Sequence, residues 1–240
     1  MLLDYGADVL FRDGEGRTAL MAAIKNNHFK IIKILINSNK LLVNVPSYDG
    51  ITPLMLAISE KRLNTISILI NDGALLNEVS DQGLTALMMA CIGGDIDIVT
   101  LLLKKGPDLN LQNNQGFTAL MLAISNKNTE VAFDLIKHGA NIDLRNKEGH
   151  TSLLIAILRN EDKLSLELIK RNADLEAKSD DGINALILAA YSGKENIIKA
   201  LIDKVDLNAA DKNKQSALYA AISKVRFLLI FNFLIFIYSF

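Results

Sequence analysis

Apolar residues recur along this chain with the period of an α-helix, in short stretches separated by turn-forming residues. After Thr85, the side chains of Leu87, Ala90 and Cys91 fall on one face of a helix. The Gly93-Gly94 pair follows, and glycine weakens a helix more than any residue except proline. The pattern predicts a short helix that begins after Thr85 and ends at these glycines.

A second apolar stretch follows in the same unit. Ile98, Leu101 and Leu102 have the i, i+3, i+4 spacing of a helix face. Gly106 can end that helix in the left-handed conformation, and Pro107 cannot continue it. The unit therefore reads as two helices joined and bounded by turns.

The same pattern occurs seven times, at steps of 32 to 34 residues. In each copy, a hydroxyl or amide residue lies two positions before a leucine and five before an alanine. Such a period is typical of a solenoid, in which each unit buries its apolar face against its neighbours. The first residues of the copies are Thr18, Thr52, Thr85, Thr118, Thr151, Asn184 and Ser216. The leucines are Leu20, Leu54, Leu87, Leu120, Leu153, Leu186 and Leu218, and the alanines are Ala23, Ala57, Ala90, Ala123, Ala156, Ala189 and Ala221.

The repeated threonine is suited to begin a helix. The hydroxyl of Thr85 can accept a hydrogen bond from an amide that the first helical turn leaves without a partner. Pro53 directly after Thr52 agrees with this, because proline is best tolerated at the first helical position. Asn39 and Asn172 stand where a loop glycine is expected, and asparagine also adopts the left-handed conformation.

The unit resembles the ankyrin repeat. That family carries Thr-Pro/Ala-Leu-x-x-Ala at the start of its first helix and Gly-Ala-Asp/Asn-x-Asn in its loop. The helix motif appears here as Thr18-Ala19-Leu20-Met21-Ala22-Ala23, Thr52-Pro53-Leu54-Met55-Leu56-Ala57 and Thr118-Ala119-Leu120-Met121-Leu122-Ala123. The loop motif appears as Gly73-Ala74-Leu75-Leu76-Asn77 and Gly139-Ala140-Asn141-Ile142-Asp143. The resemblance implies an all-α solenoid of stacked helix-turn-helix units with β-hairpin-like loops.

The period divides the chain into repeats and two irregular ends. Residues 1–12 read as a partial repeat that lacks its first helix, and residues 211–224 as a degenerate repeat. An extra residue near Leu41-Leu42 lengthens the first whole repeat. The whole ankyrin repeats are predicted at 13–46, 47–79, 80–112, 113–145, 146–178 and 179–210, and an apolar C-terminal tail at 225–240.

The apolar tail has two interpretations. Five of the nine phenylalanines lie in it, and Phe227 to Phe240 comprises 14 residues, short of the ~20 that a membrane-spanning helix needs. We interpret it as a degenerate last helix packed on the seventh repeat, or as the end of a truncated longer protein. Attachment of the chain to a membrane through this tail is the alternative.

The composition excludes some functions. The 240 residues include 26 basic and 27 acidic side chains, for a formal net charge of −1. Nucleic-acid binding depends on a surplus of cations, so a nucleic-acid partner is not expected. Cys91 is the single cysteine, which fits a reducing compartment, and the start of the sequence does not resemble a secretory signal. We therefore expect a cytoplasmic protein.

No set of residues indicates catalysis or metal binding. His28, His138 and His150 lie in three different repeats, and one cysteine is too few for a zinc site. Cys91 occupies a small-residue position in a helix and is interpreted as part of the core. Acidic pairs such as Asp180-Asp181 fall in turns, where the backbone favours aspartate. The sequence predicts no catalytic residue, no cofactor and no metal.

Recognition is expected where the repeats differ from one another. The resemblance implies a concave surface made of the turn tips, or fingers, and the late positions of each first helix. The residue before the helix-capping threonine is apolar in three successive repeats. The predicted partner-binding residues are an apolar stripe of Ile51, Leu84, Phe117 and Ile92, the flanking Glu60 and Asn126, and the equivalent late-helix residues Leu158 and Tyr191.

These side chains could instead fold back onto the neighbouring finger and be buried by the stack. With that alternative open, the resemblance implies a non-catalytic scaffold that binds another protein. A membrane-associated protein is the second interpretation. An interaction module of a larger enzyme or channel is the third.

Overall fold

The computed structural model describes residues 5–223 and divides into two compact units, Met1–Asn114 and Gln115–Phe240. Within the described residues there are 13 α-helices and no strand, and the two isolated bridges join Arg12 to Thr18 and Ala210 to Ser216. The predicted all-α fold is confirmed. None of the helices in this part of the chain is long and apolar enough to cross a membrane. The apolar tail 225–240 lies outside the described residues, as do the first four residues of the partial repeat 1–12.

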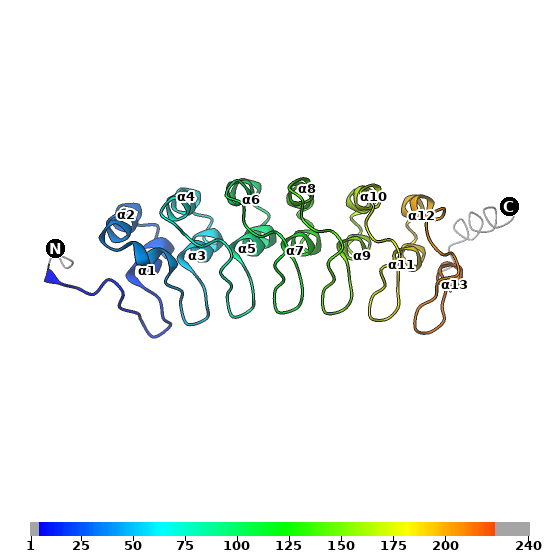
Figure 1. Ribbon diagram of the computed structural model, residues 1–240, viewed down its shortest axis with the longest axis horizontal. Helices are drawn as coiled ribbons and strands as arrows, with labels where there is room; N and C mark the ends of the chain where they lie inside the picture. The colour runs from blue at the N-terminus through cyan, green and yellow to red at the C-terminus, as the bar shows by residue number, and fades with distance from the viewer. Residues whose placement is uncertain (1–4, 224–240) are drawn as a thin grey trace. The chain divides into compact units, whose positions relative to one another are not determined.

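The first unit contains three helix pairs. The first helices α1, α3 and α5 lie side by side in one row, and the second helices α2, α4 and α6 in another (Figure 1). The fingers 13–17, 47–51 and 80–84 project from the first-helix row. The helices are α1 Ala19–Lys25, α2 Phe29–Ser38, α3 Pro53–Ser59, α4 Leu63–Asn71, α5 Ala86–Gly93 and α6 Ile96–Leu103, with a 3₁₀ helix η2 at Lys40–Asn44.

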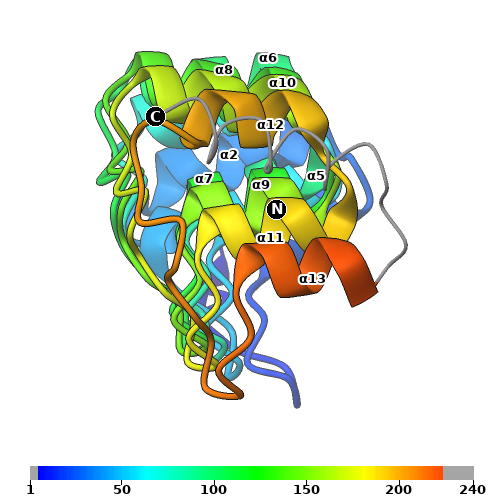
Figure 2. The ribbon, with the colours of Figure 1, turned by 90° about the vertical axis from the view of Figure 1, so that its right-hand side faces the viewer.

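The second unit repeats this arrangement. Figure 2 shows α11 and α13 as neighbours in the first-helix row and α10 and α12 in the second-helix row. The last first helix, α13, closes the described part of the chain. The helices are α7 Ala119–Ser125, α8 Thr129–Lys137, α9 Ser152–Leu158, α10 Asp162–Lys170, α11 Ala185–Ser192, α12 Glu195–Leu201 and α13 Ala217–Ser223.

The repeated apolar residues form the core. All seven repeat alanines and six of the seven repeat leucines are buried, whereas Leu218 in α13 is half-buried. Four of the six second helices, α4, α6, α8 and α10, bury two adjacent pairs of positions, such as Ile98 with Val99 and Leu102 with Leu103 in α6. The sequence predicted that Leu101 lies on the buried face of α6 with Ile98 and Leu102. Leu101 is only half-buried, so the prediction was wrong for this residue.

The predicted helix caps form in six of the seven repeats. The hydroxyl of Thr85 accepts a hydrogen bond from the backbone N–H of Met88, and equivalent bonds form at Thr52, Thr118, Thr151, Asn184 and Ser216. Thr18 has the extended backbone of a cap but no such bond, and its buried hydroxyl has no hydrogen-bond partner in the described chain. Thr18 therefore shares the position of the other capping residues but not their hydrogen bond.

Of the two asparagines expected in the left-handed conformation, one adopts it. Asn172 has a φ of 58°. Asn39 has a φ of −156°, which is extended backbone, so the prediction for this residue was wrong. The Asn39 side chain instead accepts a hydrogen bond from the N–H of Leu41 and caps η2. The inserted residue is absorbed by this 3₁₀ turn, which buries Leu42 and Val43 in place of an ordinary loop.

Successive fingers within each unit contact one another through the backbone. The N–H of Asp81 donates to the carbonyl of Asp49 at 3.0 Å, and the N–H of Asn114 donates to that of Gln82 at 3.1 Å. Gly83 lies at this contact with a φ of +74°, and a Cβ there would come within 2.7 Å of the Asn114 nitrogen. Glycine is required here for two reasons, the left-handed backbone and the close approach of the next segment.

Replacing Thr52 by alanine removes a formed cap and should lower the free energy of unfolding by about 1 kcal/mol. Thr18→Ala is the matched control, because it removes a hydroxyl that makes no cap and is buried without a partner. Urea unfolding followed by circular dichroism should show a lower midpoint for Thr52→Ala and little change for Thr18→Ala. Equal losses would contradict the assignment of the two threonines.

Gly83→Ala should destabilise the chain more than Gly73→Ala. Both glycines have a positive φ, which disfavours alanine by about 1–2 kcal/mol. Only at Gly83 does the added methyl group meet another finger, since a Cβ at Gly73 has nothing within 4 Å. Thermal unfolding of the two variants measures the difference, and matching midpoints would argue against a close finger contact.

The Cys91 thiol should be inert in the folded protein. Cys91 is fully buried in α5, and this burial raises the pKa of its thiol well above the usual range. The reactive thiolate is therefore suppressed. An aromatic disulfide reagent at mildly alkaline pH should label Cys91 only after a denaturant is added. Rapid labelling of the native chain would contradict the buried position.

Candidate functional site

Four of the predicted partner-binding residues lie in the first unit, on the face formed by the fingers and the first helices. Ile51 and Leu84 each end a finger and precede a capping threonine. The carbonyl of Ile51 accepts from the N–H of Ser47 at 2.9 Å, and that of Leu84 from the N–H of Ser80 at 3.0 Å. These bonds close the fingers and fix the position of both side chains.

Leu84 and Ile92 are brought together in one depression, which we call the apolar groove. It has a volume of about 250 Å³ and lies between the ends of α3 and α5. Ile92 in the last turn of α5 is 38% exposed, and Leu84 is half-buried. The groove is lined by Ile58, Ser59, Lys61, Leu84, Met89, Ala90, Ile92, Gly93, Asp95 and Ile98.

Ile51 and Glu60 line a second and larger depression, which we call the finger pocket. It has a volume of about 650 Å³ and lies between the first two fingers and helices α1 and α3. Its lining includes the exposed ring of Tyr48 and the half-buried side chain of Leu56. Apolar side chains therefore meet several charged groups in this pocket.

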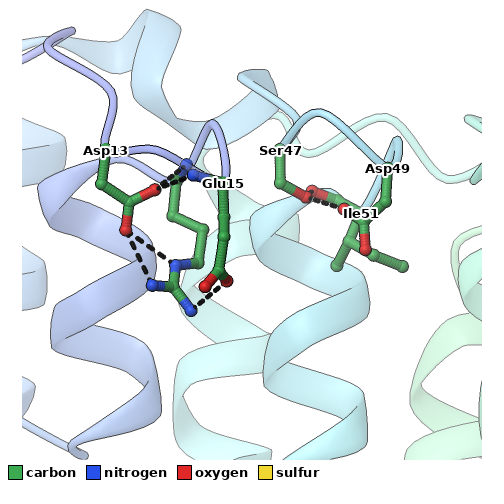
Figure 3. A network of polar contacts seen from close by, with 6 residues as sticks. Asp13, Glu15, Ser47, Asp49 and Ile51 are labelled. Carbon is green, nitrogen blue, oxygen red and sulfur yellow. Dashed lines mark hydrogen bonds and ion pairs between the residues drawn. The ribbon is translucent and has the colours of Figure 1, made fainter.

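The first finger pairs its own cation with both of its carboxylates, and Figure 3 draws these contacts as dashed lines from Asp13 and Glu15. The guanidinium of Arg17 lies 2.8 Å from Asp13 and 2.5 Å from Glu15. The hydrogen bond from the backbone N–H of Arg17, and then that from its side chain, lowers the pKa of Asp13. The side-chain hydrogen bond to Asp13 raises the pKa of Arg17. Both carboxylates are thus partly neutralised within their own finger.

The next two fingers carry carboxylates that are not paired with a cation in the described part of the chain. The side chain of Asp49 accepts a hydrogen bond from the hydroxyl of Ser47 (Figure 3). The backbone carbonyl of Asp49 also accepts a hydrogen bond from the N–H of Asp81. Among the described residues, neither Asp49 nor Asp81 forms an ion pair. The fingers of the first unit therefore carry two carboxylates without ion pairs, one of which, Asp49, lines the finger pocket.

The other four predicted residues lie in the second unit. Phe117 is half-buried directly before the α7 cap, Leu158 at the end of α9 is 46% exposed, and Tyr191 near the end of α11 is 52% exposed. Asn126 is exposed, but its side-chain amide donates to the carbonyl of Leu122 at 2.8 Å and so completes the end of α7. The predicted stripe of Ile51, Leu84 and Phe117 is therefore divided between the two units.

The alternative interpretation was that the stack buries these side chains. It holds in part for the residues before the caps and does not hold for the late first-helix residues. The three residues before the caps are half-buried, whereas Ile92, Leu158 and Tyr191 are exposed. Late first-helix positions thus offer more accessible apolar surface than the finger ends do.

Sequence reasoning missed two contributors to this surface. Leu56 and Met89, both four residues after their capping threonine, line the finger pocket and the apolar groove respectively. Their recurrence at one position of the repeat was a signal that could have identified them. The other omission is the row of finger carboxylates, which the composition conceals because the charges of the whole chain nearly balance.

The histidines do not gather into a site. His28 is exposed at the start of α2, and the His138 ring contacts the backbone carbonyl of Asp134 at 2.8 Å. The His150 ring contacts Glu148 at 3.0 Å within one finger. In residues 5–223, no group of three or more histidine, cysteine or acidic side chains could hold a metal ion.

The chain resembles a small part of two known proteins in sequence. It is 42% identical over 52 residues to Rabankyrin-5 of Mus musculus and 40% identical over 52 residues to Rabankyrin-5 of Homo sapiens. Each match covers 22% of this chain and 4% of the relative. The chain therefore spans only a small fraction of the length of these relatives.

The fold matches a solved structure over most of its length. The crystal structure of the ankyrin repeat domain of Bcl-3 aligns with a TM-score of 0.77 at 24% sequence identity. The alignment covers 86% of this chain and 95% of that domain. At this level of identity the likeness concerns the fold, which agrees with the predicted solenoid.

A family model described as ankyrin repeats (3 copies) matches residues 1–80, 73–146 and 153–238. These matches take in most of the sequence, and they include the helix and loop motifs from which the resemblance was first inferred. Ankyrin repeats are a general protein–protein interaction module and are typically not enzymes. The chain belongs to the ankyrin repeat family.

Proposed function

We propose that this chain is a non-catalytic scaffold that binds a partner protein on the face formed by its fingers and first helices. The observation that carries the proposal is the apolar groove, where Leu84, Met89 and Ile92 form an open depression on that face. Apolar anchors that enter such depressions contribute a large share of the binding energy of protein interfaces. A groove of about 250 Å³ is smaller than the ~300–1,000 Å³ of small-molecule sites and suits a single side chain.

The surface is supported by rigid elements. Thr85 caps α5 through the N–H of Met88, and the finger that carries Leu84 is closed by a backbone hydrogen bond. Side chains on such elements lose little conformational freedom on binding, which favours affinity. In the second unit, Phe117, Leu158 and Tyr191 occupy the corresponding positions, and we propose that they form a recognition surface of that unit.

We also propose that the protein acts in the cytoplasm. Its single cysteine is buried as a thiol in the core of α5, which suits a reducing compartment. Localisation of the tagged full chain by microscopy tests this proposal.

Replacing Leu84 and Ile92 together by serine should abolish partner capture without unfolding the chain. Both side chains are at least partly accessible, so the substitutions should weaken binding more than they destabilise the fold. We expect partner binding to become about tenfold weaker or more. The measurement is affinity capture with the full chain as bait, followed by quantification of each captured protein.

The matched control is Ile31→Ser with Ile34→Ser. These two exposed residues lie on α2, in the second-helix row, and should not affect capture. Partners that survive the Leu84 and Ile92 substitutions but disappear with the α2 substitutions would place the binding surface on the second helices.

A further inference from the structure

We propose that the first unit recognises a basic, apolar segment of its partner, with one apolar side chain in the apolar groove and a lysine or arginine at Asp49 and Asp81. This inference rests on the proposed function and specifies the chemistry of the partner. The apolar side chain packs against Leu84, Met89 and Ile92. The cation lies against the ends of the second and third fingers.

The charges of the fingers determine which charge a bound segment of the partner should carry. The fingers 13–17, 47–51 and 80–84 carry the carboxylates Asp13, Glu15, Asp49 and Asp81 and one cation, Arg17. Arg17 is already bound to both carboxylates of its own finger. The two carboxylates that remain are therefore complementary to a positive charge, and an acidic segment would be repelled.

The spacing of these two carboxylates is fixed before any partner binds. Asp49 is the third residue of the second finger and Asp81 the second residue of the third finger. The backbone bond of 3.0 Å from the N–H of Asp81 to the carbonyl of Asp49 joins these two residues directly and holds the fingers together. Like charges on adjacent fingers repel each other, and a bound cation relieves this repulsion. The stack thus presents a preorganised pair of acceptors, which lowers the entropy lost on binding.

Three further charges lie near the first two fingers. The guanidinium of Arg12 lies over the ring of Tyr48, 6.0 Å from its centre, and forms no ion pair with Asp49. Lys25 lies in the last turn of α1, and Glu60, which also lines the finger pocket, follows the last turn of α3. These opposite charges occupy the helix ends and not the finger tips. Lys61 and Asp95 both line the apolar groove, so that groove also contains one charge of each sign.

A library of random linear peptides displayed on phage, selected against the full chain, tests the proposal. The selected peptides should combine a large apolar residue with a nearby lysine or arginine. Their affinity should fall as the salt concentration rises from about 0.05 M to about 0.5 M, because exposed charges are screened. Selected peptides without excess basic residues, or failure to select any peptide, would overturn the proposal.

The decisive variant is Asp49→Asn with Asp81→Asn, which leaves the apolar groove intact. It should weaken a selected basic peptide about fivefold at low salt, with the difference disappearing at high salt. The matched control is Asp97→Asn with Asp203→Asn, which removes the same charge from exposed carboxylates outside the fingers and should have no such effect. Equal effects of the two pairs would refute recognition by the fingers.

The Leu84→Ser and Ile92→Ser variant separates this proposal from the broader one. If it loses binding while the Asp49 and Asp81 substitutions have no effect, the surface is correct and the basic partner is wrong. If neither variant changes binding, the proposed surface itself is wrong. Circular dichroism of each variant verifies that it is folded.

Discussion

The contact between successive fingers is the constraint on which each unit depends. In the first unit, the N–H of Tyr48 donates to the carbonyl of Glu15. One repeat later, the N–H of Asp81 donates to the carbonyl of Asp49. In the second unit an equivalent bond joins Asp180 to Glu148. Because the fingers are held at a fixed separation, the first helices that follow them begin at the same separation and can bury their leucines and alanines against one another. A glycine at the contact allows this approach.

Most of the fold could be predicted from the sequence because the repeats report the same physical requirement several times. One threonine before a helix is weak evidence, but a threonine that recurs with the same leucine and alanine identifies a cap and a buried face. The predictions failed where one repeat differs from the others. Asn39 sits beside an inserted residue, and the 3₁₀ turn that absorbs the insertion changes its backbone conformation. The position of Leu101 depends on how α6 turns against its neighbours, which a spacing of three and four residues does not define.

The candidate site was less accessible to prediction than the fold. The position of Leu84 before a cap and of Ile92 late in a helix could be inferred, and the structure places both in one groove. The depth of that groove depends on Met89 and on Ile58 from the preceding repeat, so no single repeat contains the information. The charge pattern was hidden for a related reason. Arg17 and Asp49 are equally visible in the sequence, but only the structure shows that Arg17 is occupied by its own finger.

Stability and recognition are therefore assigned to different positions of the same repeat. The leucines Leu54 and Leu87 are buried and invariant among the repeats, because every unit needs them to stack. The residues at the finger ends and late in the first helices contribute less to the core and differ from one repeat to the next, as Ile92, Leu158 and Tyr191 do. Substitutions at these exposed positions change the surface chemistry with little effect on the stack. Such a division lets a repetitive scaffold present an irregular surface, and an irregular surface is what selective recognition of one partner requires.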